Sequence, residues 1–477
     1  MLNRWRKLAT AAAWALGALA AVLLVRWSIW PLFGGQKLPP SVCAAVTSIL
    51  MGLLLSPRTT PWPVRWRKPA TAAAWALGAL GAVLLVRWSI WPLFGGQKLT
   101  LRMVCAAVTS FLVVAMLSPR TIRWLVRMKL GDRPEFDHAE LNELTRHKSA
   151  TPTMGGILIV LAILVATYLF ADMVNFYVRM AFMVVIWLAG LGAVDDWLKL
   201  RAARLARAAG ADAKPTRDGL RSYQKVLFQI ALAVLLSFFI HHHGKHSCFW
   251  PDADWPIGAN LKEMLARGQG SAMQYFFLPI DAGPFALPVA AFVIVTVLVM
   301  VGSSNAVNLT DGMDGLAGGC MLIVAAVFLL LTWVTGVAQW ACQFHLPFVP
   351  SSAELTVLCA AMIGACLGFL WFNCLPAQVF MGDTGSLPLG GLIGYVAVVT
   401  RQEMMLLIAG GIFVMEAVSV ILQVGCFKMT GGQRIFRCSP IHHHFHLLGW
   451  AESKVVVRFW LLGLMFAAVA VATLTLR

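Results

Sequence analysis

A pair of adjacent aspartates is the first feature of this sequence that could carry chemistry. The segment GAVDDWLKL contains Asp195 and Asp196 near the end of a long apolar run. Neighbouring residues on a helix point about 100° apart, so the two carboxylates should have different tasks. One could face a metal ion or a substrate, while the other holds a partner group or faces a basic loop. The pair could equally mark a membrane boundary.

A second segment, NAVNLTDGMDGLAGG, combines amides, acids and glycines. It carries Asn305, Asn308, Asp311 and Asp314. If the segment is helical, the two aspartates share one face because they are three residues apart. Polar groups beside glycines at a helix start suit an anionic ligand. A glycine-rich packing interface with a polar cap is the other interpretation, and the two acids favour the ligand site.

A third segment, FMGDTGSLPLGG, places Asp383 in a glycine-flanked turn just before an expected helix. Mg²⁺ takes one or two protein carboxylates together with substrate phosphates, so Asp383 is a candidate Mg²⁺ ligand. Phe380 could stack on a flat ring, although an ordinary interfacial aromatic residue would look the same in sequence.

Histidines gather in a basic segment near the C-terminus. His442, His443, His444 and His446 lie in SPIHHHFHLLGW. Consecutive histidines lack the spacing of a helical zinc pair, and imidazoles suit contact with phosphate near neutral pH. A metal site is the alternative interpretation. A second run, His241–His243 with His246, is interpreted as a feature of a loop on the other side of the membrane.

Two further features are weaker. The segment KSATPTMGG offers Lys148 and Thr153, but alone it is typical of a helix start with a proline. Cys248 and Cys342 could pair, because both fall in segments expected on the side opposite the histidine loop.

Composition indicates what must position these residues. The chain has 477 residues, of which 59% are hydrophobic and 12% are charged. Soluble domains are about 45–50% apolar and about 25% charged, so an ordinary soluble protein is excluded. The net charge of +17 is explained by Lys and Arg in cytoplasmic loops, without nucleic acid. The ten cysteines show no C-x-x-C spacing, which argues against a zinc or disulfide framework.

Apolar runs long enough to cross a bilayer recur along the whole chain. They fall at 9–31, 41–55, 70–92, 101–118, 153–172, 178–200, 224–240, 285–304, 318–337, 353–373, 386–400, 404–427 and 455–475. The fold class is therefore an all-α polytopic membrane protein. Lys and Arg flank alternate ends of the runs, which places the N-terminus inside and the C-terminus outside. The polar segments described above then share the cytoplasmic face, apart from the His241–His246 run.

The N-terminal part contains a near-exact repeat. Residues 4–38 and 65–99 differ only at Leu8/Pro69 and Ala20/Gly81, and a weaker echo extends the repeat to 4–62 and 65–124. We therefore expect a duplicated transmembrane hairpin region over 1–100, with about three additional helices, and a catalytic membrane domain over 101–477.

The order of the motifs resembles a known family. TPTMGG, VDDWLK, NAVNLTDGMDGLAGG, PAQVFMGDTGSLPLGG and IHHHF followed by GWAESKVVVRFW occur in the order found in phospho-N-acetylmuramoyl-pentapeptide transferases. These enzymes belong to the polyprenyl-phosphate N-acetylhexosamine-1-phosphate transferases, and the resemblance covers roughly 101–477. It implies a ten-helix bacterial inner-membrane enzyme with a cytoplasmic-face site.

The reaction implied by the resemblance transfers phospho-MurNAc-pentapeptide from UDP-MurNAc-pentapeptide to undecaprenyl phosphate, giving lipid I and UMP with Mg²⁺. A homodimer is compatible with the sequence.

The resemblance also implies roles for single residues. Asp383 is the expected Mg²⁺ ligand, and Asp195 and Asp196 are the acidic pair, one of which would act as a base on the lipid phosphate. His442 and His443 complete the catalytic set. The expected substrate-binding residues are Lys148, Thr153, Asn305, Asn308, Asp311, Asp314, Asn373, Phe380, Gln423 and His444. Two positions depart from the family pattern, with Ala150 in place of glycine and His446 in place of an acid.

Two other functions stay open at this point. A sister enzyme of the superfamily would transfer GlcNAc-1-phosphate to a polyprenyl phosphate, but HHHF followed by GWAESKVVVRFW favours the MurNAc-pentapeptide branch. A secondary transporter would use intramembrane acids as an ion relay. Transporters tend to have matched broken helices with a site near the midplane, whereas the acids here lie at the boundary.

Overall fold

The computed structural model describes residues 98–127, 148, 151–209, 219–247, 271–278 and 285–476, with isolated positions between 78 and 91. The chain divides into two compact units, Met1–Lys98 and Leu99–Arg477. The predicted spans 9–31 and 41–55, and most of 70–92, lie outside the described residues. The same holds for Ala150 and Cys248.

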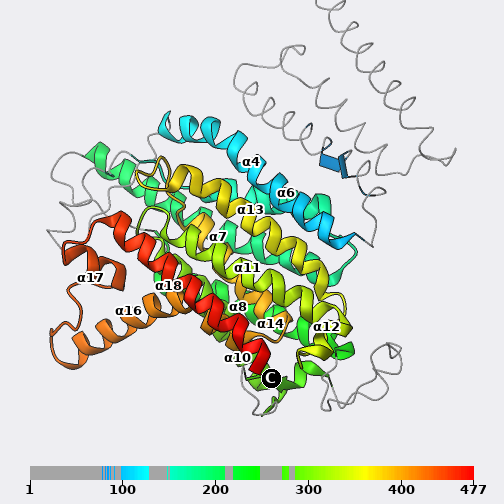
Figure 1. Ribbon diagram of the computed structural model, residues 1–477. Coiled ribbons are helices and arrows are strands. Elements are labelled where there is room, and N and C mark those ends of the chain that lie inside the picture. The colour runs from blue at the N-terminus through cyan, green and yellow to red at the C-terminus, as the bar shows by residue number, and fades with distance from the viewer. Residues whose placement is uncertain are drawn as a thin grey trace, which may run out of the picture. The chain divides into compact units, whose positions relative to one another are not determined.

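Eight described helices are long and apolar enough to cross a membrane. They are α4 (Leu99–Arg127), α7 (Phe176–Ala209), α8 (Ser222–His243), α10 (Val289–Thr310), α11 (Leu316–Gly336), α13 (Leu355–Asn373), α16 (Gly411–Met429) and α18 (Glu452–Ala472). Two shorter apolar helices, α6 (Gly156–Phe170) and α14 (Asp383–Val399), complete the bundle shown in Figure 1. The all-α polytopic fold is thus confirmed, and each predicted span from residue 101 onward corresponds to helical structure.

Short elements connect the long helices. The helical ones are α12 (Ala338–Gln343), α15 (Glu403–Ala409), α17 (Ile441–Leu447), η3 (Gly244–His246), η4 (Ala272–Gln274), η5 (Ser352–Glu354) and η6 (Thr473–Leu476). A small antiparallel pair, β1 (Tyr275–Phe276) and β2 (Phe285–Ala286), lies before α10.

Two helical expectations differ from the structure in detail. The span predicted over 404–427 is divided into α15 and α16, which meet at two consecutive glycines, Gly410 and Gly411. Asp311 and Asp314 do not share a helix face, because α10 ends at Thr310 and α11 begins at Leu316. Gly315 in the intervening turn has φ of +79°, a backbone conformation that favours glycine and interrupts the helix.

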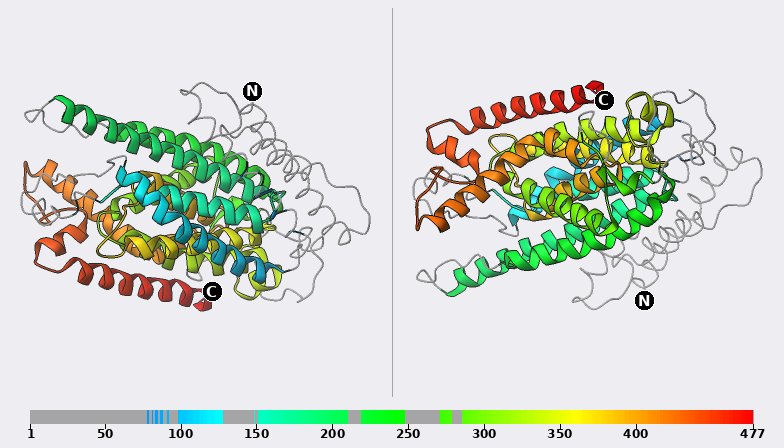
Figure 2. Two further views of the ribbon diagram at one scale, coloured as in Figure 1. Left: turned by 90° about the horizontal axis from the view of Figure 1, so that it is seen from above. Right: turned by 90° about the horizontal axis from the view of Figure 1, so that it is seen from below.

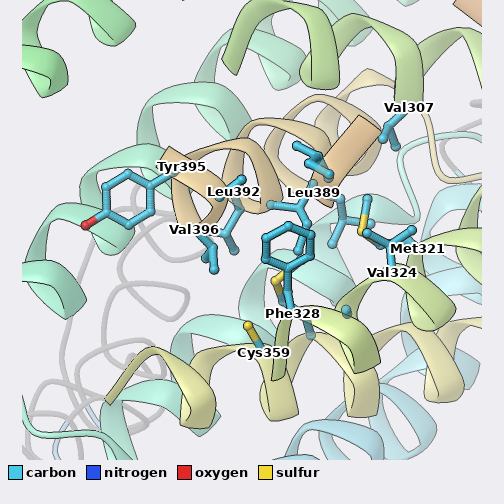
Figure 3. Packing of buried hydrophobic residues seen from close by; sticks show 14 of the residues in the cluster. Val307, Met321, Val324, Phe328, Cys359, Leu389, Leu392, Tyr395 and Val396 are labelled. Atoms are coloured by element: carbon cyan, nitrogen blue, oxygen red, sulfur yellow. The ribbon is translucent and has the colours of Figure 1, made fainter. Parts of the chain in front are cut away.

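Helix α14 forms the centre of the core. All of its residues are buried, and it packs between α7 and α10, which contribute most of its contacts. Figure 3 shows its Leu389, Leu392 and Val396 facing Phe328 of α11. A Cβ added at Gly390 of α14 would collide with the backbone oxygen of Ser303, so the glycine lets α10 approach closely.

Helix α4 packs along α13 beside α6, as Figure 1 shows. A Cβ at Gly364 of α13 would collide with the backbone oxygen of Ala107 in α4. Near the start of α4, buried Arg102 donates two hydrogen bonds to the Glu354 carboxylate, at 2.8 and 2.7 Å, and one to the Phe170 carbonyl. Close backbone packing and one buried ion pair therefore fix α4 against the bundle.

The alternating helix directions bring the polar segments to one end of the bundle. The ends of α7, α10, α13 and α16 meet there with the beginnings of α6, α8, α11, α14 and α18. Figure 2 shows the red helix α18 running from this end to the C-terminus at the other end. The His241–His243 run lies at the opposite end, away from the other polar segments, as the sequence predicts. The prediction of a loop was wrong, because these three residues form the last turn of α8 and His246 ends η3.

Candidate active site

Three aspartates form the centre of the polar end. Asp195 and Asp196 come from α7, and Asp383 is the first residue of α14. One carboxylate oxygen from each lies within 4.8 Å of the others, and all three residues are buried. A Cβ at Gly192 of α7 would collide with the backbone oxygen of Asp383, so this glycine permits the close approach of the two helices.

Asp196 caps the beginning of α14. Its carboxylate accepts hydrogen bonds from the backbone nitrogens of Asp383 at 3.3 Å and Thr384 at 3.0 Å, and from the Thr384 hydroxyl at 2.6 Å. The first N–H groups of a helix have no partner within the helix and attract negative charge. Asp196 therefore fixes the helix end that presents Asp383.

Asp195 faces basic groups instead. Its carboxylate accepts a hydrogen bond from the backbone nitrogen of Leu220 and pairs with two lysines, Lys199 and Lys225, each at 2.7 Å. The two adjacent aspartates thus have different partners, in agreement with their angular separation on the helix.

The lysines also reach Asp383. Lys225 Nζ lies 2.7 Å from Asp383 Oδ2, and Lys199 Nζ lies 3.3 Å from the same oxygen. Two cations and three carboxylates therefore share one small volume. Such a cluster can neutralise an anionic ligand while it retains oxygen ligands for a metal ion.

Asn308 and Asp311 border the aspartate cluster. Asn308 donates hydrogen bonds to Asp383 Oδ1 at 2.9 Å and to the Ser386 hydroxyl at 2.8 Å. The carboxyl group of Asp311 lies beside the backbone nitrogen of Gly382. Burial, followed by the nearby charges of Asp383 and Asp196, raises the pKa of Asp311 well above its usual range.

A buried ion-pair network lies on the other side of the 311–315 turn. Lys148 Nζ lies 2.5 Å from both Asp314 and Glu452. The Asp314 backbone nitrogen donates to Glu452, and its carboxylate accepts from the Ala377 backbone nitrogen. This network joins three parts of the chain: Lys148 before α6, Asp314 in the turn after α10, and Glu452 at the beginning of α18.

The TPTMGG and FMGD segments pair through their backbones. Phe380 N donates to the Pro152 carbonyl, and Gly155 and Gly156 donate to the carbonyls of Phe380 and Met381, all at 2.8 Å. Thr153 therefore lies in the strand-like stretch beside Phe380. The ring of Phe380 is partly exposed, and Lys148 Nζ is 5.9 Å from its centroid.

His442 and His443 are buried in α17, with ring centroids 4.1 Å apart. A Cβ at Gly312 would collide with His442 Nε2, so the histidines pack directly against the 311–315 turn. Burial, then the neighbouring His442, His446 and Lys148, holds the pKa of His443 well below its usual range. This histidine is therefore neutral at physiological pH.

Four predicted residues make contacts that brace the structure. Asn305 donates to Gln229 of α8, and Asn373 joins Gly315 N to the Val379 carbonyl. The Gln423 amide binds the backbone of Ile435 and Phe436. His444 Nδ1 accepts from the Arg437 backbone nitrogen. In this structure these side chains hold segments that border the site.

Several residues at the site were not anticipated. Lys199 and Lys225 reach the aspartates, Thr384 donates to Asp196, and Ser386 accepts from Asn308. Glu416 and Glu452 contact His442 and Lys148. Lys199 follows Asp195 by four residues, and this spacing on a helix predicts an ion pair between the two side chains. Lys225 at the start of an apolar run looks like an ordinary membrane-boundary charge.

The donor set fits a magnesium ion. Mg²⁺ prefers oxygen ligands and uses few protein carboxylates, and the three buried aspartates offer such oxygens from two helices. All three carboxylates already have partners: Asp196 caps α14, Asp195 pairs with both lysines, and Asp383 pairs with the same lysines and accepts from Asn308.

Comparison with known proteins agrees with this arrangement. Residues 177–401 match the family model for glycosyl transferase family 4, and residues 148–160 match phospho-N-acetylmuramoyl-pentapeptide-transferase signature 1. These ranges include Lys148, Thr153, the three aspartates and the 311–315 turn.

Curated relatives match most of the chain. A phospho-N-acetylmuramoyl-pentapeptide-transferase of Oleidesulfovibrio alaskensis is 41% identical over 383 residues, covering 80% of this chain and 95% of the relative. The proteins of the same name from Desulfotalea psychrophila and Leptospira biflexa are 42% identical over 381 residues and 40% identical over 385 residues. They cover 80% and 79% of this chain, and 95% and 94% of those relatives. The chain therefore belongs to the phospho-N-acetylmuramoyl-pentapeptide-transferase family.

Proposed function

We propose that this protein transfers phospho-MurNAc-pentapeptide from UDP-MurNAc-pentapeptide to undecaprenyl phosphate, producing lipid I and UMP. Family membership supports the reaction. The observation that carries the proposal is the buried Asp195–Asp196–Asp383 cluster with two lysines, at the end of a membrane-spanning bundle. A site at a helix-end boundary can admit a lipid from the bilayer and a nucleotide from water.

The residues divide into those that bind and those that position. Asp383 would hold Mg²⁺, whose charge reduces repulsion between the diphosphate and an anionic nucleophile. Lys199 and Lys225 would bind phosphate oxygens, and Phe380 would stack on the uracil ring. Asp196 holds the beginning of α14 in place. Positioning and charge neutralisation account for most of the catalysis of phosphoryl transfer.

The bond changes are simple. An oxygen of the lipid phosphate attacks the β-phosphorus of the UDP-sugar, and the bond from that phosphorus to the bridging oxygen breaks, so UMP leaves. The lipid phosphate is largely ionised at neutral pH, and direct attack therefore needs little help from a base. Isolation of a phosphorylated enzyme after incubation with the UDP-sugar alone would contradict direct attack.

The proposed site lies on the cytoplasmic face of the bacterial inner membrane. Basic residues near the polar end support this orientation, since cytoplasmic loops carry an excess of Lys and Arg. Described examples are Arg120, Arg123, Arg127, Arg201, Arg221, Lys428, Arg434 and Arg437. UDP-sugars are cytosolic, which requires the same orientation.

A substrate comparison tests the proposal. The purified protein is incubated with undecaprenyl phosphate, Mg²⁺ and radiolabelled UDP-MurNAc-pentapeptide or UDP-GlcNAc in parallel. We expect labelled lipid only from UDP-MurNAc-pentapeptide. Labelled lipid only from UDP-GlcNAc would assign the chain to the sister activity.

A further inference from the structure

Helix α16 carries an acidic residue inside the bundle. Glu416 lies in the middle of this membrane-spanning helix, and its side chain is fully buried. The buried residues Ile412, Glu416, Ser419 and Gln423 recur at helical spacing, so they form one inward stripe. Acids within membrane spans are costly and rare, and they generally serve a function together with a nearby partner.

The partner of Glu416 is His442. Oε2 of Glu416 lies 3.0 Å from Nδ1 of His442, and neither side chain is exposed. This contact lies within ion-pair distance but is not in hydrogen-bond geometry: among the described residues, neither carboxylate oxygen of Glu416 and neither ring nitrogen of His442 has a hydrogen-bond partner. The imidazole of His443 lies beside that of His442, with ring centroids 4.1 Å apart, and His442 has a further face that is turned away from Glu416.

That face points to the turn between α10 and α11. His442 Nε2 packs against Gly312, between Asp311 and Asp314, so tightly that a side chain at Gly312 would displace the imidazole. The ring is held between an acid on one side and the site turn on the other. Carboxylates that accept from one ring nitrogen fix the orientation and tautomer of a histidine whose other nitrogen acts.

We propose that Glu416 is a positioning residue for His442: its carboxylate, 3.0 Å from Nδ1, holds that side of the ring and directs Nε2 toward the 311–315 turn. The inference rests on the proposed transferase function, in which the 311–315 turn borders the substrate site and His442 supports that turn. It extends that site to α16, the helix of Glu416. Gln423 is the one proposed ligand-binding residue that lies in the same helix.

A purely stabilising role explains the pair less well. Burying two ionisable groups costs free energy, and well-packed apolar residues often stabilise a protein as much or more. The remainder of the inward stripe already supplies apolar contacts through Ile412 and Phe413. Apolar residues could supply the packing at this position, but they could not orient the imidazole of His442. Orientation of that ring therefore explains why an acid is present.

A double-mutant cycle on steady-state UMP release tests the inference. The variants are Glu416→Gln, His442→Asn and their combination, with Ser419→Ala as a matched control on the same buried stripe. We expect Glu416→Gln to lower kcat about 10- to 100-fold and to leave KM for UDP-MurNAc-pentapeptide nearly unchanged. The double variant should be no slower than His442→Asn, because both changes remove one function.

Several outcomes separate the possibilities. Full kcat in Glu416→Gln, or losses that multiply in the double variant, would overturn the positioning role. If Glu416→Gln fails to fold, as judged by thermal unfolding in detergent, Glu416→Asp replaces it in the same cycle, with the same non-additivity expected. Absence of UMP release by both the wild type and Ser419→Ala would instead overturn the transferase proposal on which the inference depends.

Discussion

Asp195 and Asp196 show how two adjacent carboxylates acquire different environments. Asp196 receives the N–H groups at the beginning of α14, and Asp195 receives two lysines and the backbone of Leu220. The sequence predicted this division from helix geometry alone. It could not predict the contact of Lys225 with Asp383, since that contact depends on packing between α8 and α14, which lie far apart in the chain.

Replacement of Lys225 should impair catalysis more than folding. Its ammonium group lies 2.7 Å from both Asp195 and Asp383, where it can stabilise developing charge on a phosphate. Loss of one such donor typically costs about 10²–10³ in kcat, and we expect Lys225→Met to fall in this range in a UMP-release assay. Tyr223→Phe, an exposed change on the same helix, is the control. Wild-type activity in Lys225→Met would exclude the role.

His443 should contribute to acid sensitivity. Its pKa in the folded protein lies well below the usual value, so the unfolded chain takes up a proton that the folded chain does not. The neutral, buried His443 therefore contributes to the free energy of unfolding, and this contribution is fully present above about pH 6.5, the usual histidine pKa. It is lost as the pH falls below that value, by at most about 1.4 kcal/mol per pH unit.

The measurement compares thermal unfolding in detergent between about pH 7.5 and about pH 5.5 for wild type and His443→Gln. Glutamine does not titrate, so the variant should lose less stability on acidification. An identical pH dependence for both proteins would contradict a neutral, buried His443.

At the scale of elements, apolar runs sufficed to predict the helices from residue 101 onward, because each must satisfy its backbone within the bilayer. The sequence left the 311–315 segment open: the i, i+3 spacing of its aspartates would share a face in a helix, but the structure has a turn there, in which Gly315 adopts a positive φ. Close glycine contacts, such as that of Gly192 with Asp383, decide which helices meet and have no readable signal in a single sequence.

One ion pair adds to the close backbone packing of α4 against α13. Arg102 is buried and donates two hydrogen bonds to Glu354. In the sequence echo of this helix, where Val42 corresponds to Val104, the equivalent of Arg102 is Pro40. The arginine therefore distinguishes α4 from its own copy in the N-terminal region.

Removal of this arginine should destabilise the bundle. Arg102→Met leaves Glu354 without its cation, and loss of one partner of a buried pair costs about 3 kcal/mol or more. The double variant Arg102→Met/Glu354→Gln should recover part of the loss. Thermal unfolding of both variants in detergent measures the effect, and equal midpoints for wild type and Arg102→Met would refute it.

At the scale of the whole molecule, every described site residue belongs to the unit Leu99–Arg477. The relative from Oleidesulfovibrio alaskensis aligns over 95% of its length with 80% of this chain, which leaves part of this chain outside the alignment. The duplicated region is therefore not expected to contribute to the reaction.

Deletion of residues 1–63, which removes one copy of the repeat, should leave kcat for UMP release within about twofold of wild type, because every described site residue belongs to Leu99–Arg477. The deletion variant and the full chain are compared at equal concentrations of folded protein. A loss of about 10-fold or more would show that the duplicated region supports the site.

We propose that the buried carboxylate cluster around Asp383 performs metal-dependent phosphoryl transfer. The most direct measurement is UMP release by the purified protein from UDP-MurNAc-pentapeptide and undecaprenyl phosphate, with Mg²⁺ or with EDTA, for wild type and Asp383→Ala. We predict release by the wild type with Mg²⁺ only, and loss of release in Asp383→Ala despite an unchanged fold. Release that is equal in wild type and Asp383→Ala, or absent from the wild type, would contradict the account.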